Sequence, residues 1–162
     1  MKKSQKKILD DLSNNLLDKK LTIAVAESCT AGLLMNILSL APQAMSFLQG
    51  GMVVYNIGQK AKHLNINPIV AQENNAVSEP IAEKMASEVA HRFNAEIGIA
   101  ITGFAQPILE ENIKDCFAYF AISLHGKTIV SKQLFGDSKK LLFSNQEIYA
   151  TQILKELLNQ LR

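Results

Sequence analysis

The segment that could do chemistry is AESCTAG at residues 26–32, which places a hydroxyl and a thiol side by side. An apolar run precedes it and a helical pattern follows, so Ser28 and Cys29 lie at a predicted strand-to-helix turn. Unpaired N–H groups at a helix start can bind an anion or stabilise an oxyanion. Ser28 is therefore a candidate nucleophile, and the alternative is that Ser28 or Thr30 only caps the helix. Cys29 is the weaker candidate, because a lone cysteine beside a strand is commonly a small buried hydrophobe.

A serine nucleophile needs a base, and Lys60 is the candidate. It follows a second predicted strand and should approach the same sheet edge as Ser28. A free lysine, with a pKa of about 10.4, is about 0.1% neutral at pH 7.4, whereas a pKa of roughly 8 leaves about a fifth neutral. Partial burial can cause such a shift. The alternative for Lys60 is a solvated side chain on a short helix. Tyr55, at the end of the second predicted strand, has its own alternative, which is to pack in the core with its hydroxyl at the rim.

The sequence gives little support for metal or histidine chemistry. His63, His91 and His125 are isolated, and no His-x-x-x-His or Cys-x-x-Cys spacing occurs. Two cysteines, Cys29 and Cys116, cannot build a disulfide framework. We therefore expect no bound metal.

Apolar periodicity predicts the elements that must position these residues. The last two strands are separated by three residues and should form an antiparallel hairpin. Helices that alternate with buried strands indicate an α/β sandwich with a mixed sheet. In such sheets ligands bind at the carboxyl ends of parallel strands, here residues 27–30, 56–60 and 102–103. Helices are expected at 4–18, 30–40, 58–64 and 78–93, and a last helix is expected over most of 138–161. Strands are expected at 21–26, 51–55, 97–102, 116–124 and 128–135.

Length and charge bound the remaining possibilities. The 162 residues predict a single domain, 1–162, and the net charge of +2 does not favour nucleic acid or an anionic membrane as partner. No apolar run approaches the roughly 20 residues that span a bilayer, and no signal-peptide core follows the N-terminal lysines. A cytoplasmic protein is the expectation.

Residues 26–32 resemble the AESCTGG signature of the CinA C-terminal domain family, the nicotinamide-nucleotide amidohydrolases. Further matches follow in the family's order: GGMVVY at 50–55 with Lys60, AVSE at 76–79 and TGFA at 102–105. The resemblance implies a three-layer α/β/α sandwich with a mixed, mostly parallel sheet that ends in an antiparallel hairpin. It also implies a small-molecule nucleotide substrate and no metal or organic cofactor, and it leaves a homodimer open.

The activity that the resemblance implies is deamidation of nicotinamide mononucleotide to nicotinate mononucleotide and ammonia. On the matching positions Ser28 is the nucleophile, Lys60 the base and Tyr55 an accessory hydrogen-bonding group. The implied substrate-binding residues are Thr30, Ala31, Gly32, Thr102, Gly103 and Lys139.

The chain departs from the family where substrate would be held. The glycine-rich loop is replaced by QPILEENIKD at 106–115, and Ala31 and Asn75 stand where the family has glycines. Lys139 falls near the first of two family arginines, and Phe143 falls near the second. Because lysine is a point charge and phenylalanine offers no donor, we expect only a weak preference for the mononucleotide over its riboside.

Two other functions stay open. One is hydrolysis of another small amide by the same pair of residues. The other is a degenerate, non-catalytic module that binds a nucleotide or a protein. The intact Ser28, Tyr55 and Lys60 favour an enzyme, whereas the altered loop favours a binding module.

Overall fold

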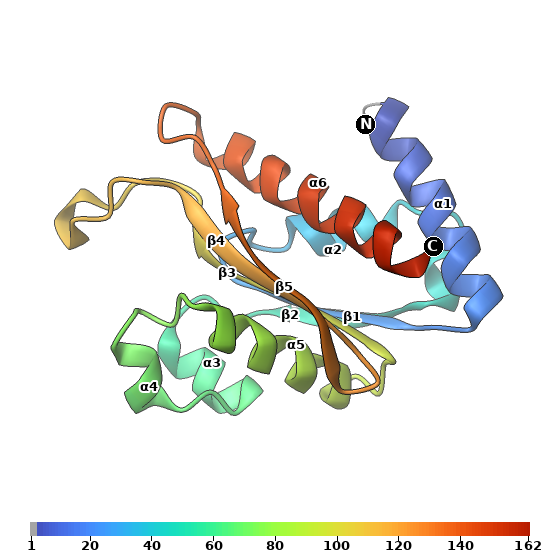
Figure 1. Ribbon diagram of the computed structural model, residues 1–162, viewed down its shortest axis with the longest axis horizontal. Coiled ribbons are helices and arrows are strands. Elements are labelled where there is room, and N and C mark those ends of the chain that lie inside the picture. Colours follow the sequence, from blue (N-terminus) through green and yellow to red (C-terminus); the bar gives the residue numbers. More distant parts are fainter. Residues whose placement is uncertain (1–2) are drawn as a thin grey trace.

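Five strands form one mixed sheet in the order β2-β1-β3-β4-β5 (Figure 1). The computed structural model describes residues 3–162. β1 pairs in parallel with β2 and β3, whereas β4 pairs antiparallel with β3 and β5. The expected α/β class and the hairpin that ends the sheet are therefore confirmed. The strands are β1 (Ile23–Glu27), β2 (Leu48–Val53), β3 (Ile97–Phe104), β4 (Phe117–Leu124) and β5 (Lys127–Phe135).

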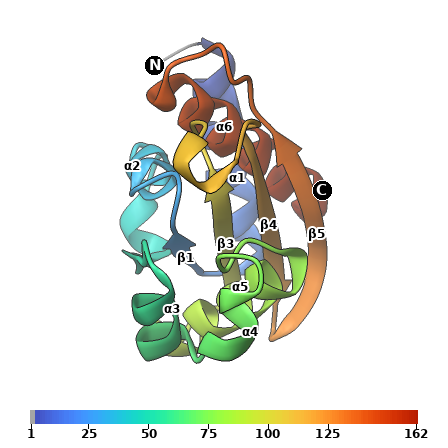
Figure 2. The same ribbon diagram turned by 90° about the vertical axis from the view of Figure 1, so that its left-hand side faces the viewer.

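Helices cover both faces of this sheet and complete three layers (Figure 1, Figure 2). One face carries α1 (Lys3–Lys19), α2 (Leu33–Ser39) and α6 (Leu142–Leu161). The other face carries α3 (Ile57–Leu64), α4 (Pro68–Gln72) and α5 (Glu79–Arg92). Two short 3-10 turns, η1 (Ala44–Ser46) and η2 (Leu109–Glu111), lie in connections. Within residues 3–162, no helix is both long and apolar enough to cross a bilayer.

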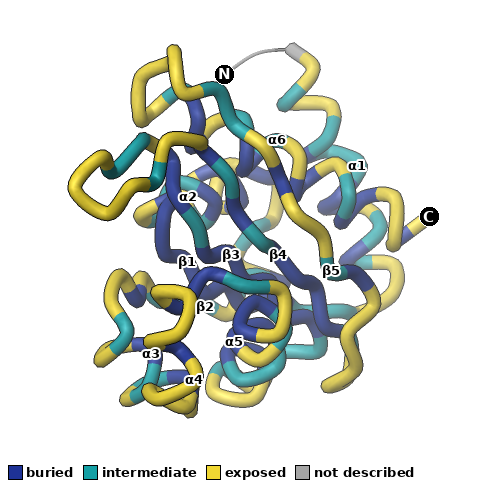
Figure 3. Tube along the Cα trace, turned by 60° about the vertical axis from the view of Figure 1, so that its left-hand side comes forward, coloured by how far each residue is buried: buried dark blue, intermediate teal, exposed yellow. Residues whose placement is uncertain are grey.

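The two faces of the sheet bury different kinds of side chain. Large aliphatic residues such as Leu12, Leu38 and Leu157 fill the space between the sheet and α1, α2 and α6. Small residues such as Ala86 and Ala100 predominate between the sheet and α5. All five residues of β1 are buried, because helices lie on both of its sides (Figure 3). A strand covered on both faces is expected to be continuously apolar, which explains the run at its start.

Several element boundaries differ from the predicted ones. α2 begins at Leu33 instead of residue 30, because Ala31 and Gly32 adopt positive φ angles of 51° and 96°. β2 begins at Leu48 instead of residue 51, whereas α6 (Leu142–Leu161) fills most of the predicted range 138–161. α4 was not expected from apolar periodicity. Its start nevertheless carries a local signal, since the Asn67 side chain accepts from Ile69 N–H and a proline follows Asn67.

Candidate active site

Ser28 and Lys60 meet at the carboxyl ends of β1 and β2. Ser28 follows β1 directly, and Lys60 lies in the first turn of α3, the helix after β2. Lys60 Nζ donates to Ser28 Oγ over 3.1 Å, and the two residues are only 3% and 5% exposed. The parallel pairing of β1 with β2 explains the contact, because it brings both carboxyl ends to one edge of the sheet. Two of the predicted residues are thus side by side.

Burial sets the protonation of Lys60. Removal from water lowers the pKa of Lys60 to about 8, because a low-dielectric surrounding disfavours the ammonium form. A pKa of about 8 leaves about a fifth of the side chain as neutral amine at pH 7.4. A neutral amine has a free electron pair, and hydrogen-bond contact with Ser28 Oγ lets it accept the hydroxyl proton. The pair therefore has the geometry and the protonation of a nucleophile and its base.

Cys29 is buried beside this pair but does not share its chemistry. Burial raises the pKa of Cys29 to about 12, so the thiol stays protonated near neutral pH. Because the thiolate is the reactive form, a thiol with this pKa is a poor nucleophile. Ser28 is therefore the better placed of the two candidate nucleophiles.

Glu27 is the site residue that the sequence analysis missed. Its buried carboxylate accepts hydrogen bonds from the N–H groups of Gly32, Leu34 and Met35 at 3.1, 3.0 and 2.7 Å. Glu27, and neither Ser28 nor Thr30, therefore caps the first turn of α2. The available signal was an acidic residue at the end of the strand that leads into a helix start, where negative charge is favoured.

A cavity of about 410 Å³ opens over the Ser28–Lys60 pair, between the start of α3 on one side and the loop after β3 on the other. Tyr55 lies at its rim with 63% of its surface exposed. Asn56 forms part of the wall and also caps α3, since its side chain accepts from Gln59 N–H. The lining residues are Ser28, Cys29, Tyr55, Asn56, Ile57, Gly58, Lys60, Asn75, Val77, Gly103, Phe104, Ala105, Gln106, Ile108 and Leu142.

The residues predicted to bind substrate are placed unevenly around this cavity. Gly103 lines it, whereas the Thr102 hydroxyl lies behind the wall and donates to the Ala76 carbonyl over 2.7 Å. Ala31 is exposed, and the buried Thr30 hydroxyl has no hydrogen-bond partner in the described part of the chain. Together with Gly32, these two residues lie outside the lining.

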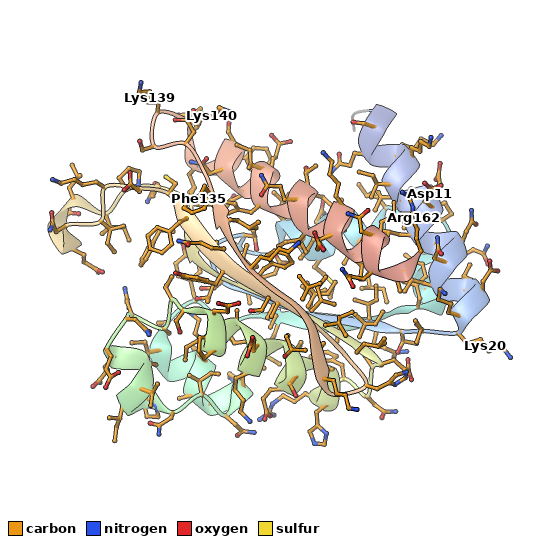
Figure 4. All side chains as sticks on the ribbon, viewed as in Figure 1. Asp11, Lys20, Phe135, Lys139, Lys140 and Arg162 are labelled. Carbon is orange, nitrogen blue, oxygen red and sulfur yellow. The ribbon has the colours of Figure 1, made fainter. Side chains whose placement is uncertain are left out.

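Lys139 also lies outside the cavity lining. It is exposed on the connection between β5 and α6, at the tip of the loop at the upper left of Figure 4. Its backbone N–H donates to an Asp137 carboxylate oxygen over 2.9 Å, which orders the turn.

Buried polar side chains of α6 hold the loops that carry the site. Gln146 Nε2 donates over 2.8 Å to the carbonyl of Cys29, the residue that follows Ser28. Asn145 Nδ2 donates to the Ala105 carbonyl over 2.9 Å, and the Tyr149 hydroxyl donates to the Phe104 carbonyl over 3.0 Å. One helix thus fixes the carboxyl ends of β1 and β3. The sequence analysis considered only Lys139 and Phe143 near the start of this helix and did not single out its buried polar side chains.

Side chains of residues 3–162 that could ligate a metal are dispersed. No group of three or more His, Cys, Asp or Glu side chains comes together in this part of the protein. The chemistry that the cavity offers is instead that of an acyl transfer: a hydroxyl nucleophile, an amine of lowered pKa and an apolar wall that limits access of water.

Comparison with known proteins gives a consistent result in sequence and in structure. The CinA C-terminal domain family matches residues 5–158. A relative from Clostridioides difficile (strain 630), named as a competence-damage inducible protein, is 41% identical over 155 residues, which is 94% of this chain and 35% of the relative. A CinA-like protein of Mycobacterium marinum is 43% identical over 99 residues, 61% of this chain and 23% of that protein. The chain thus spans about a third or less of the length of these relatives.

Solved structures share the whole architecture. The crystal structure of a competence-damaged protein (CinA) superfamily protein from Enterobacter cloacae superposes with a TM-score of 0.90 at 27% identity, covering 98% of this chain and 92% of that one. A member of the same superfamily from Escherichia coli gives a TM-score of 0.81 at 27% identity, covering 96% of this chain and 93% of that one.

Proposed function

Because the chain belongs to the CinA C-terminal domain family, we propose that it is a Ser-Lys amidohydrolase of pyridine nucleotides. The proposed reaction is deamidation of nicotinamide mononucleotide to nicotinate mononucleotide and ammonia. The observation that supports it most directly is the 3.1 Å contact between Lys60 Nζ and Ser28 Oγ inside the cavity.

The proposed reaction has two halves. In the first, Lys60 Nζ takes the proton of Ser28 Oγ while the oxygen attacks the carboxamide carbon, and a tetrahedral intermediate forms. The Lys60 ammonium then protonates the amide nitrogen, the C–N bond breaks and ammonia leaves an ester on Ser28. In the second half, water gives a proton to Lys60 and attacks the ester carbon. The Ser28–acyl bond breaks, Oγ regains the proton, and the carboxylate product is released.

The negative oxygen of each intermediate needs hydrogen-bond donors nearby. The N–H group of Cys29, a residue of the cavity lining, makes no hydrogen bond to other groups of residues 3–162. It follows the proposed nucleophile directly in the chain, as an oxyanion donor commonly does. We assign it this role in preference to the Gly32 N–H, which already donates to Glu27.

The test is release of ammonia from nicotinamide mononucleotide by the purified protein and by Ser28→Ala. Loss of the hydroxyl removes the covalent route, so we expect a decrease of at least ~10³-fold in kcat. Ser39→Ala, at an exposed serine of α2, is the matched control and should keep full activity. Cys29→Ala should retain the activity that Ser28→Ala loses.

Turnover that persists in a folded Ser28→Ala protein would contradict the covalent mechanism. Binding of the nucleotide without release of ammonia would favour a binding module over an enzyme. A circular dichroism spectrum of each variant establishes that the fold is kept.

A further inference from the structure

The two arginines of the protein, Arg92 and Arg162, lie away from the cavity. Arg92 ends α5 near the start of β3, at the opposite end of the sheet from Ser28, and Arg162 Nη2 lies 3.6 Å from Asp11 Oδ2 at the C-terminus (Figure 4). Among the described residues, Lys60 is the only cationic side chain in the cavity lining. Lys60 is buried and is the proposed base, so within residues 3–162 the cavity lining offers no guanidinium or exposed ammonium group to bind a phosphate.

The start of α2 is also closed to an anionic ligand. Unpaired N–H groups at a helix start are a common phosphate site. Here the Glu27 carboxylate takes the N–H groups of Gly32, Leu34 and Met35. The chain's own carboxylate thus occupies the place that a phosphate would need.

The mouth of the cavity carries negative charge. Asn75 lines the cavity, and its Nδ2 donates to Glu111 Oε2 over 3.1 Å. Glu111 belongs to the loop at residues 105–116, which projects at the left of Figure 1. This loop carries three carboxylates against one lysine, Lys114. It also reaches into the cavity wall, because Ile108 lines the cavity and pairs with Ile113 at the base of the loop. A negative field at the entrance opposes a phosphate dianion and attracts a cation.

The walls suit a flat ring and a neutral polar group. Phe104 and Tyr55 offer aromatic surface, against which a cationic ring is stabilised. Asn56 and Gln106 offer amide groups that can bond sugar hydroxyls. These features match a pyridinium carboxamide that bears a sugar.

Building on the proposed amidohydrolase function, we propose that this site prefers the N-riboside of a pyridinium carboxamide to the mononucleotide, with Glu111, held by Asn75, as a specificity-determining residue. The phosphate of a mononucleotide meets a negative mouth without an arginine to offset it. The riboside keeps the cationic ring and the reacting carboxamide and lacks the group that the entrance opposes.

Binding to Ser28→Ala tests this selection without depending on turnover. Isothermal titration with nicotinamide riboside and nicotinamide mononucleotide should show tighter binding of the riboside, by about threefold or more. Equal affinity, or tighter binding of the mononucleotide as a phosphate clamp of charge-assisted hydrogen bonds would give, would overturn the inference. Failure of both ligands to bind would overturn it as well.

Charge variants test the part played by the mouth. Glu111→Gln keeps an oxygen that can accept from Asn75 and removes the charge, so the ratio of kcat/KM for mononucleotide to riboside should rise about 3- to 10-fold at low ionic strength. Glu147→Gln, the same change at an exposed position of α6, should leave the ratio unchanged. Leu142→Arg places a guanidinium on the lining and should raise the ratio by about 10-fold or more. An unchanged ratio in Glu111→Gln would contradict the role of Glu111.

The two proposals fail in different ways. Absence of ammonia release from both substrates contradicts the amidohydrolase function, while the titrations still decide which ligand the site selects. Turnover of the mononucleotide with a kcat/KM about 10³-fold above that of the riboside supports the function and contradicts the selection.

Discussion

At the scale of single residues, the site depends on a lysine that is held away from water. Lys60 is almost fully buried, and the described ion pairs do not include it. Its contact with Ser28 is a hydrogen bond to a neutral hydroxyl, which does not offset the cost of burying an ammonium ion. The same burial that costs stability therefore supplies the neutral amine that the proposed reaction needs.

The pH dependence of activity should report this lysine. With the pKa of Lys60 lowered to about 8 by burial, kcat/KM should rise about tenfold per pH unit below that value and level off above it. Lys60→Arg should be almost inactive, because a guanidinium stays protonated at every working pH. The measurement is the rate of ammonia release between pH 6 and 9.5. A flat profile, or an active arginine variant, would show that another group is the base.

The stability of a Lys60→Met variant separates loss of the base from loss of the fold. The pKa of Lys60 is about 8 in the folded chain and about 10.4 in the unfolded one, so the unfolded chain binds the proton more readily. The free energy of unfolding therefore falls as the pH falls from about 10.4 to about 8, by roughly 3 kcal/mol in all. Lys60→Met should be inactive yet more stable than wild type in urea at pH 7. Lower stability would contradict this account of its burial.

Sequence order was enough to place Ser28 and Lys60 at one edge of the sheet, because each follows a predicted strand, and their roles came only from the resemblance to the family. The role of Glu27 could not be read in the same way. It depends on Ala31 and Gly32 turning in the left-handed region, which swings the first N–H groups of α2 back onto the carboxylate. A tertiary turn of this kind leaves only a weak trace in sequence.

At the scale of elements, the buried polar side chains of α6 hold the loops of the candidate site without lining its cavity. Gln146 reaches the Cys29 carbonyl from a helix that begins more than a hundred residues later. Gln146→Ala should leave that buried carbonyl unpaired and lower the free energy of unfolding by about 1–3 kcal/mol. We also expect kcat to fall more than KM changes, because the turn that carries Ser28 is loosened.

Gln152→Ala is the matched control for this prediction, since Gln152 is exposed on the same helix. Its stability should stay within about 0.5 kcal/mol of wild type. Urea unfolding and steady-state kinetics of both variants make the comparison. Equal effects of the two substitutions would mean that α6 does not position the nucleophile turn.

Elements with a strong apolar period were predicted nearly correctly, and the errors have local causes. β2 was placed three residues late, because it begins with a partly exposed stretch that contains Gly50 and Gly51, which have low strand propensity. The hairpin turn was placed well, since His125 and Gly126 take the positive φ angles of a two-residue turn. The last helix fills most of its predicted range, and the residues before Leu142 stay a loop because Asn145 exchanges hydrogen bonds with the Asp137 backbone.

At the scale of the whole molecule, the site lies between two layers that pack at different distances. Large side chains separate α1 and α6 from the sheet, whereas α5 approaches it over alanine and glycine. At the tightest point Gly98 of β3 faces the Ala86 carbonyl of α5, which also accepts from Ser123 Oγ over 3.2 Å. This close approach matters for the cavity, because Val77 lines it just before α5 begins.

Substitution of Gly98 should therefore change the KM at the candidate site as well as the stability of the core. A Cβ at Gly98 would lie 1.9 Å from the Ala86 oxygen, so Gly98→Ala must push α5 away from the sheet. Overpacking of this kind costs about 3 kcal/mol or more. In the control Gly126→Ala, nothing lies within 4 Å and only the positive φ of 76° is unfavourable, at about 1–2 kcal/mol. Thermal unfolding should show a larger decrease in melting temperature for Gly98→Ala than for Gly126→Ala. Any Gly98→Ala protein that folds should have a raised KM, because Val77 moves with α5. Equal melting temperatures would mean that α5 is free to adjust and does not fix the wall of the cavity.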